Sequence, residues 1–208
     1  MKKIIAFVLV LVLTAGVFAG CGSKNTLTLN VYNWGEYISD GSEGSFDTVR
    51  EFEKWYEETY GQKVTVNYST FASNEDMYSK IASGAVSYDV IVPSDYMIAR
   101  MAQEGLLLPL DFDNIPNYSQ IDETFRGLYY DPENLYSVPY TYGIVGVIYD
   151  ANVVDEEDIG GWELLWNEKY SGRILQFNNP RDAFGTAMYK LGIDVNTTDK
   201  AAWDQAYQ

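Results

Sequence analysis

The sequence predicts an α/β protein with a mostly parallel sheet. Stretches with the two-residue period of a strand alternate along the chain with longer stretches of helical period, as in βαβ units. In addition, the apolar run over 88–92 ends at Pro93 and lacks polar alternation, which is typical of a strand buried on both faces of a parallel sheet. Both observations favour the same class.

The first half of the chain supplies three predicted strands and three predicted helices. Polar and apolar residues alternate over 27–33, which predicts a strand. Apolar residues at helical spacing predict a helix over 45–60 that stops at Gly61. The same criteria predict, in order, a strand over 63–71, a helix over 73–84, a strand over 88–92 and a helix over 94–105.

A change in composition divides the chain. The stretch over 111–136 is rich in Asp, Asn, Pro and Tyr and has little periodicity. Beyond it we expect, in order, a strand over 137–150, an acidic loop over 155–162, a short helix over 163–170, a strand over 172–177 and a helix over 179–192. The break therefore predicts a second α/β unit that begins near residue 143.

The N-terminus predicts an extracytoplasmic protein. Two lysines precede an unbroken apolar run over 4–13, which predicts a signal peptide over 1–20. Cys21 follows two small residues, as in a bacterial lipobox, so we expect it to carry a lipid anchor and to begin a polar tether over 21–26. An ordinary secretory signal beside an unrelated cysteine is the alternative. As Cys21 is the only cysteine, a disulfide within the chain and a Cys-based metal site are excluded.

Composition narrows the possible partners. The chain has 30 acidic and 14 basic side chains, a formal net charge of −16, which argues against nucleic acid and anionic lipid as partners. With no histidine, it has no His-based catalytic triad and no His metal ligand. Its 18 Tyr and 5 Trp residues are an unusual aromatic load for this length. A cationic ligand is compatible with these features.

Candidate site residues follow the predicted strands. Ligands of open α/β sheets bind beyond the carboxyl ends of the strands. Three such ends carry carboxylates, hydroxyls, amides and aromatics, with Arg181 as the only basic side chain. These residues are Trp34, Glu36 and Tyr37, then Ser94, Asp95 and Tyr96, and finally Asn178, Asn179 and Asp182.

This combination suits an alkyl ammonium group. Such an amine has a pKa near that of lysine, about 10.4, and is charged at neutral pH. Carboxylates give it charge-assisted hydrogen bonds, and each Trp or Tyr face adds about 0.5–2 kcal/mol of cation–π attraction. We therefore expect a cation-binding wall that works without catalysis, metal or cofactor.

Each candidate also has a purely structural explanation. Trp34 and Tyr37 are alternatively core residues that close the end of the sheet. Ser94 and Asp95 serve equally well as caps of the following helix. For Asn179, capping is the favoured role, because a proline follows it at the first helical position. Capping does not explain the repeated pairing of an aromatic with an acid.

Five segments, in this order, resemble the bacterial spermidine/putrescine-binding proteins: YNWGEYI, TFASNEDMYSKI, YDVIVPSDYMI, YSVPYTYGIVGVIYD and GRILQFNNPRDAFGTAMYKLG. That family is the extracytoplasmic solute-binding component of polyamine ABC transporters. The resemblance implies a two-lobed periplasmic-binding-protein fold of type II with the ligand between the lobes. Lobe 1 would span 27–140, and 141–208 would hold the crossover and part of lobe 2. Members of the family continue beyond the equivalent of Gln208, so the second lobe is expected to be incomplete.

The resemblance assigns roles to several of these residues. Trp34, Glu36 and Tyr37 match the family's first cleft segment, in which the acid pairs with an amine and the aromatics flank the chain of the ligand. Ser94 and Tyr96 match the second segment.

One residue of the second lobe matches the family, whereas two other positions of the chain depart from it. Asp182 matches an acid of the second lobe. Gly35 replaces a hydroxyl residue of some members, and Asn179 stands where some members have an amine-binding Asp. Asp95 adds a carboxylate nearby.

The combined expectation is a lipid-anchored receptor that is not an enzyme. It would bind putrescine or spermidine and deliver it to the permease and ATPase of an ABC transporter, touching the membrane through its lipid anchor only. An oligosaccharide receptor is the alternative, although it would favour more amides and arginines at the strand ends. A glycosidase is disfavoured, because no two acids form a defined pair.

Overall fold

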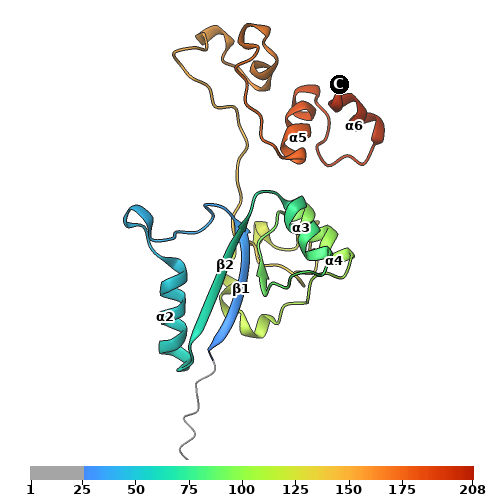
Figure 1. Cartoon of the computed structure of the whole chain (residues 1–208). Coiled ribbons are helices and arrows are strands. Elements are labelled where there is room, and N and C mark those ends of the chain that lie inside the picture. Colours follow the sequence, from blue (N-terminus) through green and yellow to red (C-terminus); the bar gives the residue numbers. More distant parts are fainter. Residues whose placement is uncertain (1–25) are drawn as a thin grey trace, which may run out of the picture. The chain divides into compact units, whose positions relative to one another are not determined.

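The computed structural model describes residues 26–208 (Figure 1). The predicted signal peptide, Cys21 and all but the last residue of the tether lie outside the described residues. The chain divides into two compact units with the boundary between Pro139 and Tyr140. Of the helices in the described range, none combines the length and the apolar character needed to cross a membrane.

The first unit is built on a parallel sheet of three strands. The strands are β1 (Leu27–Trp34), β2 (Val64–Phe71) and β3 (Val90–Ile91), in the spatial order β2-β1-β3. Leu27 of β1 is opposite Val64 of β2, and Tyr32 is opposite Ile91 of β3. The predicted parallel sheet is therefore confirmed for this unit.

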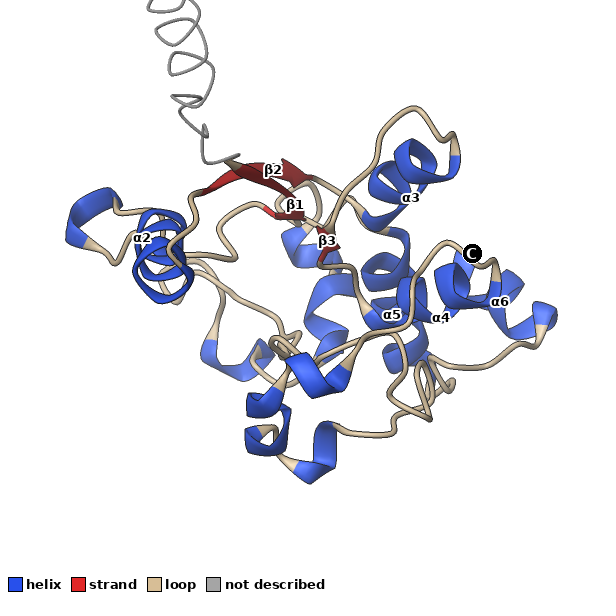
Figure 2. Ribbon diagram, turned by 90° about the horizontal axis from the view of Figure 1, so that it is seen from below, coloured by secondary structure: helices blue, strands red, loops and turns tan. Residues whose placement is uncertain are grey.

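Three α-helices connect and cover these strands: α2 (Thr48–Tyr60), α3 (Asn74–Ala82) and α4 (Asp95–Gln103). Helix α2 begins after the predicted start at residue 45, because the Asp47 side chain caps it by accepting from the backbone N–H of Arg50. Gly61 ends the helix with a left-handed φ of 66°. Helix α2 lies on one side of the sheet, and α3 and α4 lie on the other (Figures 1 and 2).

The core of the first unit joins the sheet to α3 and α4. Its buried members are Tyr32, Phe71, Met77, Met97 and Met101, and the half-buried rings of Trp34 and Tyr96 pack against them. Rings and thioethers fill such irregular spaces well. Because Tyr32 and Trp34 are two residues apart on β1, both point to this face. The core thus fixes the residues at the carboxyl end of the sheet.

The third strand differs from its prediction over 88–92. β3 spans only two residues, and the Val90 side chain is exposed. β3 is an edge strand among the described residues, since it pairs with β1 alone. The expectation of burial on both faces was therefore wrong, because the face of β3 that carries the Val90 side chain is exposed.

The aperiodic stretch forms short turns of 3-10 helix, which are η2 (Phe112–Asn114), η3 (Pro116–Gln120) and η4 (Glu123–Phe125). Another such turn, η1 (Ser42–Gly44), lies earlier in the chain, between β1 and α2. Asp131, 5% exposed, holds the segment that follows η4. Its carboxylate accepts from the backbone N–H groups of Leu135, Tyr136 and Ser137 at 2.9 Å and from the Ser137 hydroxyl at 2.8 Å. The carboxylate thereby fixes the path of the chain just before the boundary between the units.

The second unit contains two α-helices, α5 (Pro180–Leu191) and α6 (Lys200–Tyr207), and three 3-10 turns, η5 (Glu156–Asp158), η6 (Trp162–Trp166) and η7 (Glu168–Tyr170). Helix α5 confirms the helix predicted over 179–192, whereas the short helix predicted over 163–170 is two 3-10 turns. Phe184 of α5 packs against Trp203 of α6 at 5.2 Å between ring centroids, and Tyr189 stacks on Trp162 at 5.3 Å.

The strands predicted over 137–150 and 172–177 do not form. Both segments are irregular, with Ile148 98% and Leu175 95% exposed. A strand satisfies its backbone N–H and C=O groups only by pairing with a neighbour. Within the described residues of this unit no segment pairs with either one, so apolar side chains suited to a sheet are left at the surface.

Candidate functional site

The carboxyl ends of β1 and β3 meet at one edge of the sheet. The two strands are parallel, and the backbone N–H of Val92 continues their pairing by donating to Tyr32 at 3.0 Å. Trp34 ends β1, and Ser94 stands at the N-cap position of α4. The structure therefore brings together the first two groups of residues that the sequence predicted.

At the end of β1, one aromatic is held by the core and the residues after it are exposed. The Trp34 ring packs on Phe71 at 4.7 Å between centroids and approaches the exposed Tyr37 ring at 6.1 Å. Glu36 is exposed and has a φ of 60°, in the left-handed region that favours glycine. Backbone strain of this kind concentrates at functional sites. Trp34 thus packs against the core that closes this end of the sheet, and its role in ligand binding stays a prediction.

At the end of β3, a buried amide organises two hydroxyls. Asn74, 0% exposed, donates from Nδ2 to the Ser94 hydroxyl at 3.0 Å and to the Tyr96 hydroxyl at 2.9 Å. Its Oδ1 accepts from the Ser94 backbone N–H at 3.0 Å. The Tyr96 hydroxyl donates to Glu75 Oε1 at 3.0 Å. The Ser94 side chain does not cap α4, so its structural alternative is not realised.

Asp95 is tied to two neighbours. Its Oδ1 accepts from the backbone N–H of Tyr96 at 2.7 Å, and its Oδ2 accepts from the Tyr129 hydroxyl at 2.9 Å. Burial, with the nearby carboxylates of Asp95 and Asp131, raises the pKa of the Tyr130 hydroxyl. The carboxylates add to the effect of burial because a negative charge nearby disfavours the ionised phenolate.

Three carboxylates therefore lie near this edge without a basic counterion. In the part of the chain that the structure describes, no Lys or Arg forms an ion pair with Glu36, Glu75 or Asp95. Their charge is available to a ligand cation. With the rings of Trp34 and Tyr37, they make an edge with the chemistry expected for an ammonium group.

The remaining predicted residues lie in the second unit, at the start of α5. Asn179 caps this helix, since its Oδ1 accepts from the backbone N–H groups of Arg181 at 2.9 Å and Asp182 at 3.4 Å. The favoured structural role of Asn179 is thus realised. Asp182 lies half-buried in the first turn. A ligand role for Asn179 and Asp182 stays a prediction.

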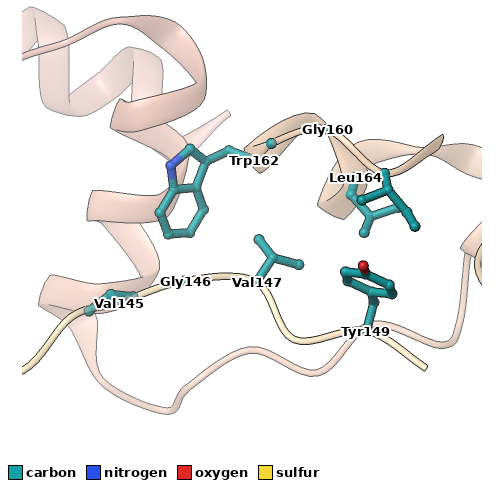
Figure 3. A pocket seen from close by; sticks show the side chains of 9 residues that line it. Val145, Gly146, Val147, Tyr149, Gly160, Trp162 and Leu164 are labelled. Atoms are coloured by element: carbon teal, nitrogen blue, oxygen red, sulfur yellow. The ribbon is translucent and has the colours of Figure 1, made fainter. Parts of the chain in front are cut away.

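A cavity of about 270 Å³ also lies in the second unit (Figure 3). The side chains that line it are apolar apart from the tyrosine hydroxyl and the indole N–H. The lining residues come from two segments: Val145, Gly146, Val147 and Tyr149, then Ile159, Gly160, Gly161, Trp162 and Leu164. No carboxylate lines it, and it is smaller than the usual 300–1,000 Å³ of ligand pockets. The chemistry of this cavity does not suit an ammonium group.

Sequence reasoning missed Asn74, Glu75 and Tyr129. The first two fall in the stretch SNED, which we interpreted only as the start of a helix. An asparagine directly after a serine that caps the helix indicates a role other than capping, because the cap position is already filled. Tyr129 lies in the aperiodic stretch, where nothing in the sequence indicates its contact.

This arrangement, a parallel sheet whose carboxyl edge carries aromatics and carboxylates that form no ion pair within the described residues, defines a binding protein of the α/β class. A family model described as bacterial extracellular solute-binding protein matches residues 48–208, and the chain belongs to this family.

Its relatives include named polyamine-binding proteins. The chain is 34% identical over 198 residues to the spermidine/putrescine-binding periplasmic protein of Escherichia coli, covering 94% of this chain and 53% of the relative. A putative spermidine/putrescine ABC transporter structure from Listeria monocytogenes matches with a TM-score of 0.71 and 36% identity, over 87% of this chain and 52% of that chain. A lipoprotein of Treponema pallidum matches with a TM-score of 0.71 and 32% identity, over 86% and 52%.

The comparisons confirm the predicted family and the predicted fold class, α/β of the two-lobed periplasmic-binding-protein type. The chain spans about half the length of the curated relatives it matches. This coverage agrees with the expected incomplete second lobe. The matched relatives are substrate-binding components of transporters rather than enzymes.

Proposed function

We propose that this protein is a lipid-anchored extracytoplasmic receptor that binds putrescine or spermidine and delivers it to the permease and ATPase of an ABC transporter. The observation that carries the proposal is the carboxyl edge of the sheet, where Trp34, Glu36 and Tyr37 stand at the end of β1 and Ser94 and Tyr96 follow β3, the strand paired with β1. The carboxylates near this edge have no basic partner in the described chain. The names of the relatives, which include spermidine/putrescine-binding proteins, support the ligand.

The anchor rests on a separate line of support. Cys21 has a lipobox-like context and is the only cysteine of the chain. The Treponema pallidum neighbour is itself called a lipoprotein. A lipid on Cys21, followed by the tether over 21–26, would hold the folded units outside the membrane.

In this proposal the aromatic faces pack on the methylene chain of the polyamine, and Glu36 pairs with one ammonium group. A hydrogen bond to a charged group contributes about 1.5–3 kcal/mol. Asp95 adds negative potential, and Asn179 and Asp182 are the proposed ligand residues of the second unit.

The proposal is tested by calorimetry on the complete gene product that contains this chain, titrated with spermidine, putrescine and a neutral oligosaccharide. Glu36→Gln should weaken polyamine binding by about 1.5–3 kcal/mol, because it removes one charged hydrogen-bond partner. The matched control is Glu43→Gln, an exposed glutamate of the same loop that also has a positive φ, of 51°.

The control should bind as the wild type does. Equal losses for both variants would indicate a general charge effect rather than a contact at Glu36. Binding of the oligosaccharide without polyamine binding would refute the proposed ligand and favour the alternative receptor.

A further inference from the structure

Asn74 lies between two of the proposed ligand residues but is itself out of reach of solvent. It is the first residue of α3, is 0% exposed, and makes three hydrogen bonds, all to Ser94 and Tyr96. A buried amide is retained only when its polar groups are satisfied. Asn74 therefore fixes the positions of both side chains.

The directions of these hydrogen bonds follow from the chemistry of the groups. The Ser94 backbone N–H can only donate, so the amide atom that faces it must be the oxygen. The Nδ2 group of Asn74 then faces the two hydroxyls and donates to both. The Tyr96 oxygen is consequently an acceptor toward Asn74.

Glu75 determines the direction of the single Tyr96 proton. A carboxylate oxygen can only accept, so the Tyr96 hydroxyl donates to Glu75 Oε1 at 3.0 Å. With its proton committed, this hydroxyl can meet any further partner only as an acceptor. An alkyl ammonium has three donors and no acceptor, so it can donate to this hydroxyl, whereas a carboxylate or carbonyl group, which only accepts, cannot.

The environment of Glu75 adds a second observation. Its other oxygen, Oε2, is buried and has no hydrogen-bond partner within residues 26–208. An unsatisfied buried carboxylate oxygen costs about 1–3 kcal/mol or more. Helix α3 therefore carries an acid at a cost in stability, which points to a role of its bond to Tyr96 other than folding.

We propose that Asn74 and Glu75 are positioning residues that set the Tyr96 hydroxyl as an acceptor toward the ligand, so that the site favours a donor such as ammonium over a group that only accepts, by orientation as well as by charge. The proposal rests on the proposed polyamine function. The core supports it mechanically, because Tyr96 packs against the cluster that contains Met77 and Met97. The hydroxyl is thus held by packing as well as by hydrogen bonds.

Orientation and charge are separated by two substitutions of Glu75 in the complete gene product. Glu75→Gln removes the charge but keeps a carbonyl oxygen that accepts from Tyr96. Glu75→Met has similar length and no acceptor, so the Tyr96 proton is released. Spermidine binding should weaken about tenfold in Glu75→Met and less than about threefold in Glu75→Gln.

The control for charge alone is Asp76→Asn, which neutralises the neighbouring exposed acid of the same helical turn. The spermidine affinity of Asp76→Asn should match that of Glu75→Gln. If Glu75→Gln binds as weakly as Glu75→Met, the effect is electrostatic and the orientation proposal is overturned.

A double-mutant cycle with Tyr96→Phe tests the path of the effect. Once the hydroxyl is absent, Glu75→Met should change spermidine affinity less than about twofold. A loss that persists in the Tyr96→Phe background would show that Glu75 acts by another route, and would overturn the proposal.

The same cycle in urea unfolding without ligand separates this inference from the proposed function. Absence of coupling between residues 75 and 96 overturns the inference even if the wild type binds polyamine. A wild type that binds no polyamine refutes the proposed function, and with it the ligand-selecting role, while coupling in urea would still establish the network as structural. Glu75→Leu serves if Glu75→Met does not fold.

Discussion

Asp131 should be the most sensitive acid of the first unit to substitution by its amide. The perturbation is Asp131→Asn, which keeps the size of the side chain and removes one acceptor oxygen and the charge. In the folded protein, Oδ2 of Asp131 accepts three hydrogen bonds and Oδ1 accepts one. With one oxygen only, asparagine leaves at least one donor facing an NH2 group.

The size of the effect follows from this geometry. A buried donor left without a partner costs about 1–3 kcal/mol, and the retained bonds lose about 1 kcal/mol of charge assistance. The free energy of unfolding should therefore fall by about 2–4 kcal/mol at pH 7. The control is Glu133→Gln in the same loop, which is exposed and should change stability by less than about 0.5 kcal/mol.

The dependence on pH has a defined sign. Burial by itself raises the pKa of Asp131, but hydrogen bonds from the Tyr136 backbone, the Ser137 hydroxyl and the Leu135 and Ser137 backbones outweigh it and hold the pKa below its ordinary value. A depressed pKa contributes stability above the unfolded value, about 3.9, and this contribution is lost as the pH falls through the folded value.

The assay is urea unfolding of wild type, Asp131→Asn and Glu133→Gln between pH 7 and pH 3. The gap between wild type and Asp131→Asn should be constant from pH 7 to pH 5 and should shrink below about pH 3.9. Equal midpoints at pH 7, or a gap that grows as the pH falls, would refute the carboxylate as the origin of this stability.

Two further predictions concern the lipid anchor and the exposed apolar segments of the second unit. Cys21→Ala should move the protein out of the membrane fraction and abolish its labelling by radioactive lipid precursors in a bacterial host, and unchanged partitioning would contradict lipid attachment at Cys21. The 208-residue chain expressed alone should aggregate, because Ile148 and Leu175 are almost fully exposed on segments of strand-like sequence. Light scattering should show that Leu175→Lys reduces this aggregation, and a monomeric wild type would contradict the prediction.

Local patterns predicted those elements that depend on local interactions. Helix α3 has a Ser cap, α5 an Asn cap followed by proline, and β1 and β2 alternate in polarity. The segments over 137–150 and 172–177 have equally strong strand patterns but remain irregular, because a strand also needs a neighbour that lies far away in sequence. Helix α6, which the sequence analysis overlooked, follows an Asp199 cap that the same local criteria would have found.

The site was predictable to the extent that topology alone positions it. The rule that ligands bind at carboxyl ends of parallel strands placed Trp34 and Ser94 at one edge, and the pairing of β1 with β3 confirms that edge. The rule says nothing of which neighbours hold these residues. Asn74 and Ser94 are 20 positions apart, and Asp95 and Tyr129 are 34 apart, so only the folded chain identifies these contacts.

Two asparagines at helix starts illustrate why equal local signals lead to different roles. Asn179 occupies the N-cap position itself, and its oxygen is used by the first turn of α5. Asn74 stands one position later, because Ser73 already caps α3 by accepting from the backbone N–H of Asp76 at 3.1 Å. Its amide is therefore free of the capping task, and all three of its hydrogen bonds cross to Ser94 and Tyr96. Because Ser73 fills the cap position, Asn74 can link the start of α3 to the proposed binding edge at the start of α4.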